Sequence, residues 1–247
     1  MPKFFVEPEH IDGDTAKIYD GDVNHITKVL RLSPKSIIMI CDGKGYDYRA
    51  EITGIDKTCV TLRLLEKLPC ETEPGVRVTL FQGIPKAGKM EYIIEKCVEL
   101  GISRIVPVIT SRTVVKLGDK KAEDKKLARW RKVAAEAVKQ CGRGIIPEVG
   151  DVVTLKEAVS LITGIDLVLA PYENERETPL KQVLSANRNV HSVGFFVGPE
   201  GGFGEEEINL LQAAGAKRVT LGKRILRTET AGHTVLTAVM YELDELQ

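Results

Sequence analysis

Val197-Gly198-Pro199-Glu200-Gly201-Gly202-Phe203-Gly204 joins a fully apolar run, residues 193–197, to a predicted helix over residues 205–214. An apolar run of strand length is typical of a parallel sheet that is covered on both faces. Ligands of open α/β sheets bind beyond the carboxyl ends of the strands, and glycine lets the main chain approach a ligand closely. The loop lacks the dinucleotide fingerprint G-x-G-x-x-G and the Gly-Lys-Ser/Thr of a P-loop. Its spacing alone therefore leaves open both a ligand site and a tight structural turn.

Strands and helices alternate on both sides of this loop. Hydrophobic periodicity predicts strands over residues 76–84, 105–109, 167–170, 193–197 and 219–221, and helices over residues 89–100, 119–141, 205–214 and 229–246. Pro107 argues for an edge or a bulge in the second of these strands. The alternation predicts an α/β domain with a mainly parallel sheet.

The first seventy residues have a different pattern. Residues 36–41, 46–52 and 58–64 are short runs of strand character, and the first two are separated by a turn at residues 42–45. Asp22 is placed to cap a short helix. Several short strands with tight turns predict a small barrel. Residues 68–75 contain two prolines and a glycine, so we predict a linker there, between domains over residues 1–70 and 75–247.

A second loop, residues 221–231, also follows a predicted strand and precedes a predicted helix. Thr228 and Thr230 are both suitable N-caps, and the segment is basic. Residues 112–143 hold eleven Lys and Arg but only four Asp and Glu, which gives this segment a net charge of +7. Such a concentration of positive charge favours a polyanionic partner, although a solvated helix face explains it equally well.

The composition limits the classes of protein to which the chain can belong. The chain has 247 residues, of which 43% are hydrophobic and 28% charged, and its formal net charge is zero, which excludes a uniformly basic coat for nucleic acid. The longest uncharged stretch, residues 230–241, is too short to span a bilayer, and we expect no secretory signal. Five cysteines without a C-x-x-C pair predict reduced thiols in a cytoplasmic protein, and four histidines without ligand spacing predict no metal site.

Taken together, Gly198–Phe203 and the segment Leu221-Gly222-Lys223-Arg224-Ile225-Leu226-Arg227-Thr228-Glu229-Thr230-Ala231 resemble the ribosomal RNA small subunit methyltransferase E family, which belongs to the SPOUT superfamily. Residues 25–31, 89–91, 111–112 and 140–143 agree with the family in order and spacing. The resemblance covers nearly the whole chain, and the pair of loop motifs is highly specific.

The resemblance implies a fold that the periodicity does not. It implies a C-terminal SPOUT domain with a mainly parallel sheet and a deep trefoil knot, preceded by an N-terminal β-barrel of PUA type that binds RNA. It also implies S-adenosyl-L-methionine as the cofactor, a homodimer and a cytoplasmic location. The final helix, with Val235, Leu236, Val239 and Leu243, would contribute to the dimer interface.

The reaction that the resemblance implies is methylation of N3 of one uridine, at position 1498, in the 16S ribosomal RNA of the small subunit. Another RNA target, such as a ribose hydroxyl of transfer RNA, stays open for a SPOUT enzyme. A non-catalytic RNA-binding module would explain the barrel and the basic segment alone. No membrane and no metal is expected among its partners.

The same resemblance assigns roles to individual residues. Uridine N3 carries a proton near neutral pH, so a base or cationic groups must assist its methylation. Arg227 and Arg112 are the expected cationic groups, and Glu229 is either the proton acceptor or simply a charge at a helix N-terminus. The expected cofactor contacts are Leu169, Pro171, Gly198, Glu200, Gly201, Gly202, Leu221, Gly222, Ile225, Leu226 and Arg227. The expected RNA contacts are His25, Lys28, Arg31, Lys116 and Arg143.

Overall fold

The computed structural model describes residues 1–19, 21–115 and 118–246 of the chain, and Lys116, one of the expected RNA contacts, lies outside them. The chain divides into two compact units. The first comprises Met1–Glu73 and Val138–Ile146, and the second comprises Pro74–Ala137 and Pro147–Gln247. The segment Val138–Ile146, which contains the end of a long helix, thus joins the first unit although it lies far beyond the predicted linker.

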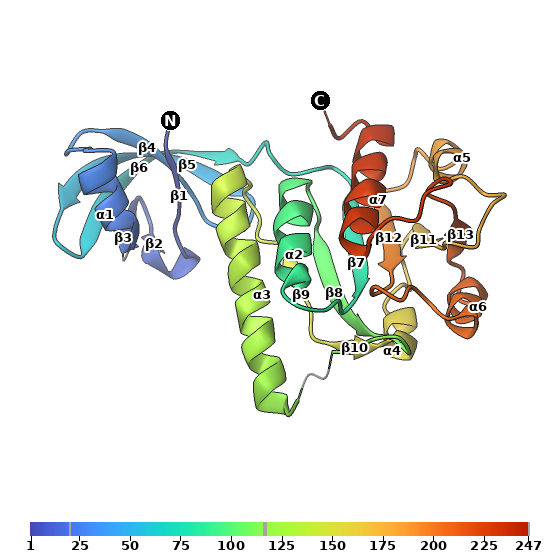
Figure 1. The fold of residues 1–247 in the computed structure, drawn as a ribbon. Helices are drawn as coiled ribbons and strands as arrows, with labels where there is room; N and C mark the ends of the chain where they lie inside the picture. Colours follow the sequence, from blue (N-terminus) through green and yellow to red (C-terminus); the bar gives the residue numbers. More distant parts are fainter. Residues whose placement is uncertain (20, 116–117, 247) are drawn as a thin grey trace. The chain divides into compact units, whose positions relative to one another are not determined.

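The first unit is built on a curled six-stranded sheet (Figure 1). Its strands lie in the order β1 (Lys3–Phe5), β4 (Ile37–Cys41), β5 (Tyr46–Ile55), β6 (Cys59–Pro69), β3 (Thr15–Tyr19) and β2 (Ile11–Asp12). Only β1 and β4 pair in parallel. Three short helical segments accompany them: η1 (Pro8–His10), α1 (Gly21–Asn24) and the π-helix η2 (His25–Val29).

Alternation places one face of this sheet in the core. In β3, Ala16 and Ile18 are buried while their neighbours are exposed, as the period of a strand requires. The three strands predicted from the sequence are present, but β6 runs through Leu68 to Pro69, which pairs with Tyr46. The predicted linker therefore begins as a strand, because the long hairpin of β5 and β6 continues past the expected boundary.

The second unit is an α/β domain in which every strand pairing among the described residues is parallel, which confirms the predicted mainly parallel sheet. Its strands lie in the order β10 (Val153–Thr154), β8 (Arg104–Ile109), β7 (Arg77–Gly83), β12 (Ser192–Val197), β11 (Leu167–Pro171) and β13 (Lys217–Val219). A further short strand, β9 (Glu148–Val149), pairs with β8. The last strand begins and ends two residues before the predicted one.

Pro107 lies in a strand that has neighbours on both sides. β8 pairs with β7 along its length, whereas its other side is shared by β9 at Ile105 and by β10 at Val108. Pro107 falls between these two short partners. Its missing N–H therefore removes no ladder hydrogen bond, and the strand needs neither an outer edge nor a bulge.

In the described part of the chain, the helices that follow the first strand of this sheet are α2 (Lys89–Glu99), α3 (Lys120–Cys141), α4 (Leu155–Ser160), α5 (Leu180–Ser185), α6 (Glu205–Ala213) and α7 (Thr228–Glu242). On one face, Phe81 stacks on Phe196 with ring centroids 4.4 Å apart, in a core that includes residues of α4 and α6. On the other face, α7 packs on β7 and β12 and lies beside α2 (Figure 1).

The placement of α7 corrects one expectation. Val235, Leu236 and Val239 are fully buried within this chain, because they pack on the sheet, so they cannot form an interface with a second copy. Among the residues that the structure describes, no helix is long and apolar enough to cross a membrane.

Candidate functional site

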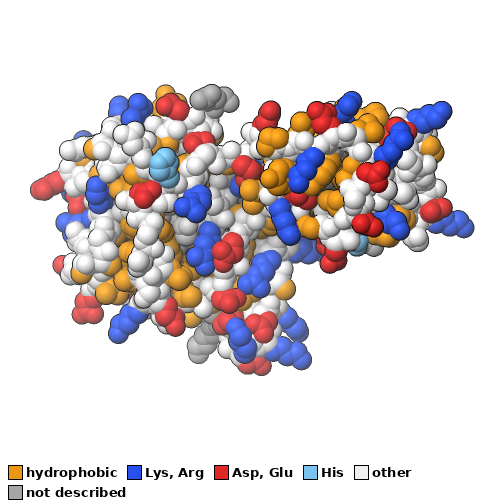
Figure 2. All heavy atoms as spheres, turned by 180° about the vertical axis from the view of Figure 1, so that it is seen from behind, with side chains coloured by type: hydrophobic (Ala, Val, Ile, Leu, Met, Phe, Trp, Pro, Cys, Tyr) orange, Lys and Arg blue, Asp and Glu red, His pale blue; other side chains and the backbone are white. Residues whose placement is uncertain are grey.

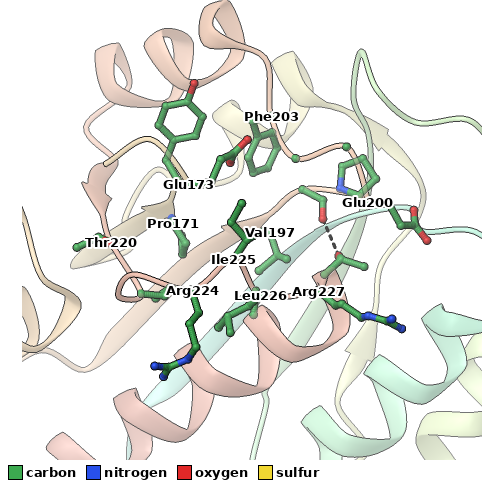
Figure 3. Close-up of a pocket in the computed structure, with 18 of the residues that line it drawn as sticks. Pro171, Glu173, Val197, Glu200, Phe203, Thr220, Arg224, Ile225, Leu226 and Arg227 are labelled. Atoms are coloured by element: carbon green, nitrogen blue, oxygen red, sulfur yellow. Dashed lines mark hydrogen bonds between the residues drawn. The ribbon is translucent and has the colours of Figure 1, made fainter. Parts of the chain in front are cut away.

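Three loops of the second unit enclose a cavity of about 420 Å³ at the carboxyl ends of neighbouring strands (Figure 3). Because β12 is inserted between β7 and β11, and β13 lies beyond β11, the loops that follow β11, β12 and β13 converge. The lining residues are Lys89, Pro171, Tyr172, Glu173, Arg176, Val197, Gly198, Pro199, Glu200, Gly201, Gly202, Phe203, Thr220, Leu221, Gly222, Arg224, Ile225, Leu226, Arg227, Thr228 and Ala231.

The loop after β12 folds back on itself so closely that only glycine fits. A Cβ atom on Gly198 would lie 2.7 Å from the carbonyl carbon of Gly202, and Gly202 has φ +66°, in the left-handed region. A Cβ on Gly83, at the end of β7, would lie 2.6 Å from Cδ of Pro199. These approaches bring the main chain of the loop to the cavity wall.

A hydroxyl joins this loop to the start of α7. Thr228 is 6% exposed, and its Oγ1 donates to the carbonyl oxygen of Gly198 at 2.6 Å. Nε2 of Gln82 donates to the same Oγ1 at 2.9 Å and to the carbonyl of Gly83 at 2.9 Å. Thr228 was expected as an N-cap, but it is the first residue of α7, after Arg227, because its hydroxyl is engaged by the loop.

One ammonium group links two carboxylates beside the cavity. Nζ of Lys89 lies 3.2 Å from Oε1 of Glu200 and 3.3 Å from Oε2 of Glu229. The pKa of Lys89 is raised, first by its hydrogen bond to Glu200 and against the opposing effect of burial. Burial acts to raise the pKa of Glu200, but hydrogen bonds from main-chain amides and from Lys89 outweigh it, and the pKa is lowered. Lys89 and Glu200 are therefore both charged at neutral pH.

A buried carboxylate fixes the loop after β11. Oε1 of Glu175 accepts hydrogen bonds from three successive main-chain amides, those of residues 176, 177 and 178, at 2.7 to 3.1 Å. Its other oxygen, Oε2, accepts from Nε of Arg218 at 2.6 Å. The pKa of Glu175 is lowered, mainly by the hydrogen bond from the amide of Glu177. The loop is thus held in one conformation where it forms the cavity wall.

The structure brings most of the expected cofactor contacts together. Those that line the cavity are Pro171, Gly198, Glu200, Gly201, Gly202, Leu221, Gly222, Ile225, Leu226 and Arg227. Leu169 does not. It is fully buried in β11, two residues before the loop begins, because its side chain belongs to the core of the sheet.

The three expected catalytic residues have different surroundings. Arg227 lines the cavity, but its guanidinium points outward into solvent (Figure 3). Arg112 is exposed, and its Nη1 donates to the carbonyl oxygen of Gly201 at 2.5 Å. Glu229 does not line the cavity, and its carboxylate forms an ion pair with Lys89, which does. Of these three residues only Arg227 lines the cavity, whereas Arg112 contacts the main chain of the loop after β12 and Glu229 contacts Lys89.

The expected RNA contacts separate into exposed and buried groups. His25, Lys28 and Arg31 are exposed on η2 and the turn that follows it. Arg143 is 5% exposed, and its Nη2 lies 2.6 Å from Oε2 of Glu73. Its guanidinium is therefore enclosed by its own unit in this conformation, unlike the other three side chains, and its contact with RNA stays a prediction.

The positive charge of residues 112–143 is largely compensated in space. Acidic side chains from outside the segment form ion pairs with Arg129, Arg131, Lys139 and Arg143, whereas Lys120 and Lys132 pair with acids of the segment itself. Around the start of α3, basic and acidic side chains are intermixed on the surface (Figure 2). The net charge of this segment therefore overstates the positive field that it presents.

A possible cation site escaped the sequence analysis. Glu7, Glu9 and His10 bring three possible ligand atoms within 4.8 Å of one another in the described part of the first unit. All three residues are wholly or partly exposed, and exposed acidic groups are common without an ion. The expectation of no metal stays a prediction.

Three positioning residues were also missed. Gln82, Lys89 and Glu175 fix the loops through contacts with residues far away in the sequence. A glutamine inside an apolar strand, as at position 82, was the only sign that a polar partner lay nearby.

Comparisons with known proteins agree with this arrangement. The family model described as RNA methyltransferase domain matches residues 72–240, and the model described as RNA methyltransferase PUA domain matches residues 18–65. The first of these covers more than half of the chain and includes all three cavity loops.

Individual relatives match over nearly the full length. The chain is 32% identical to ribosomal RNA small subunit methyltransferase E of Bacillus subtilis, covering 100% of this chain and 99% of that protein. It is 31% identical to the Synechocystis protein of the same name, covering 96% and 76% respectively. A crystal structure of the Neisseria gonorrhoeae protein of that name, bound to S-adenosyl methionine, superposes with a TM-score of 0.85 and 34% identity, covering 98% of this chain and 97% of that one.

Proposed function

The chain belongs to the ribosomal RNA small subunit methyltransferase E family, and from that premise we propose that it transfers a methyl group from S-adenosylmethionine to N3 of one uridine in 16S ribosomal RNA. The observation that carries the proposal is the cavity formed by the three converging loops. Its relative from Neisseria gonorrhoeae holds S-adenosyl methionine in a structure that shares this fold.

The residues present fit this cofactor. A volume of about 420 Å³ lies in the range of small-molecule sites. Val197, Leu221 and Leu226 offer apolar surface to a purine, and the closely folded Gly198–Gly202 turn offers main-chain atoms to polar groups. When bound, S-adenosylmethionine supplies an electrophilic methyl group. The chain itself binds, orients and excludes water, and much of the rate gain of such transfers comes from positioning.

Cationic groups of the chain assist the nucleophile. Removal of the N3 proton leaves negative charge on the uracil ring, which nearby cations stabilise. Arg227 and Lys89 line the cavity, Arg112 binds the loop at the Gly201 carbonyl, and Lys89 keeps its proton because its pKa is raised. We assign Glu229 the supporting role of fixing the Lys89 ammonium in place, since its carboxylate lies outside the cavity.

The remaining features of the proposal concern the whole enzyme. We propose that His25, Lys28 and Arg31 hold ribosomal RNA on the first unit, as expected of a PUA domain. We also propose a homodimer, a trefoil-knotted path for the cavity loops and a cytoplasmic location. Ile225, which is 84% exposed beside the cavity, supports a partner that covers it.

Two experiments test this function. Calorimetry on the purified protein should detect S-adenosylmethionine, and Gly198→Ala should abolish binding because the added Cβ would collide with Gly202. Gly21→Ala is the matched control, since a Cβ there meets nothing within 4 Å. Mass spectrometry of ribosomal RNA from a deletion strain should show loss of one N3-methyluridine. An intact N3-methyluridine together with a lost ribose methyl group in transfer RNA would replace the proposed target with the alternative one.

A further inference from the structure

The loop after β11 brings one carboxylate and one guanidinium to the cavity. Glu173 and Arg176 both line it, and both side chains are exposed. Among the described residues, neither side chain has an ion pair or hydrogen bond with another group of the chain. Glu200 and Lys89 also line the cavity, but they form an ion pair with each other at 3.2 Å.

The loop holds these two side chains in a defined place. Between them, the buried Glu175 accepts the amides of residues 176, 177 and 178 and the guanidinium of Arg218. On the opposite wall, Gly202 leaves room for the acid: a Cβ there would lie 2.9 Å from Oε1 of Glu173. Figure 3 shows Glu173 reaching across the cavity toward the loop that contains Phe203. The carboxylate therefore faces the interior although it is exposed.

We propose that Glu173 and Arg176 bind the charged amino-acid end of the methyl donor, the carboxylate of Glu173 pairing with its ammonium and the guanidinium of Arg176 with its carboxylate. This inference rests on the proposed function of the cavity. A carboxylate and a guanidinium without partners in the chain match the ammonium and the carboxylate of an α-amino acid. Charge-assisted hydrogen bonds are stronger than hydrogen bonds between neutral groups. Arg224 and Arg227 are less suited, because their guanidinium groups point away from the apolar centre (Figure 3).

The test compares three ligands by calorimetry on the full-length protein. S-adenosylmethionine and S-adenosylhomocysteine both carry the amino-acid end, whereas 5′-methylthioadenosine lacks it. Glu173→Gln and Arg176→Gln should each weaken the first two ligands about ten-fold and leave methylthioadenosine unchanged. Arg176→Lys should restore part of the loss. Glu177→Gln, which removes the same charge from the same loop outside the cavity, is the control and should bind all three ligands normally.

Each other outcome has one meaning. If the wild-type chain binds none of the three ligands, the proposed function fails and not only this inference. The wild-type chain could bind the ligands while the variants keep their full affinity, or lose affinity for all three ligands equally. Either result overturns the assignment of Glu173 and Arg176 and leaves the cofactor site in place. A loss of S-adenosylmethionine but not of S-adenosylhomocysteine in Glu173→Gln would place the carboxylate at the sulfonium and overturn its pairing with the ammonium.

Discussion

Replacing Thr228 by valine removes the hydroxyl that joins the loop after β12 to α7 without changing the size of the side chain. Two hydrogen bonds are lost: Oγ1 to the Gly198 carbonyl at 2.6 Å and Gln82 Nε2 to Oγ1 at 2.9 Å. Gln82 keeps its bond to the Gly83 carbonyl, and the half-buried Gly198 can be reached by water. The cost is therefore near the net value of two ordinary bonds, about 2 kcal/mol of the free energy of unfolding.

Urea unfolding and calorimetry with S-adenosylmethionine measure the two consequences of Thr228→Val. We expect the loss of stability and also an affinity up to about ten-fold lower, because the loop that lines the cavity is no longer held. Thr228→Ser should retain most of both. The control is Thr234→Val on the same helix, whose hydroxyl donates only to the carbonyl of Thr230. Equal effects of the two valine variants would refute the idea that the bond across the loop matters.

Three further predictions follow from ion pairs and burial. Lys89→Met should weaken S-adenosylmethionine binding about five-fold in calorimetry, because it removes the ion pair with Glu200. Adding Glu200→Gln should restore part of the affinity. If the double variant restores none, the ion pair does not hold the loop. Arg143→Met should cost up to about 3 kcal/mol in urea unfolding, because it removes the counter-charge of Glu73 and leaves that carboxylate only the amides of Gly144 and Ile145. The exposed Arg63→Met should cost under about 1 kcal/mol, and similar losses would contradict the structural role. Burial lowers the pKa of His233 below 6.5, against the opposing charge of Glu229, so the unfolded chain binds more protons and the free energy of unfolding falls as the pH drops through 6.5. His233→Gln should lack this part of the pH dependence, and an unchanged dependence would exclude it.

The sequence was sufficient for the elements whose residues act locally. The apolar runs at residues 167–170 and 193–197 became β11 and β12, because a strand buried on both faces needs no polar positions. The glycines at positions 198 and 202 were predicted to allow close approach, and the folded loop requires them for that reason. Local chemistry marked the loop after β12 as a candidate, whereas the family resemblance assigned the three loops to a ligand.

The sequence was insufficient where a partner lies far along the chain. Nothing local to Thr228 reveals that its hydroxyl bonds Gly198, thirty residues earlier, so an N-cap was expected instead. Arginine is a residue type that commonly contacts RNA, so an RNA contact was expected at Arg143. Only the fold shows that Glu73 pairs with it. The short strands β1, β2 and β3 were missed because runs of two to five residues carry little periodicity.

The strand order of the second unit governs when the protein can mature. β7 and β8 are neighbours and can pair early, whereas β11 has only β12 and β13 beside it, and both come later in the chain. During synthesis from the N-terminus, β11 must therefore wait, without a sheet to join, until the segment that separates it from β7 has emerged. The cavity between the three loops consequently forms only after β12 and β13 have been synthesised.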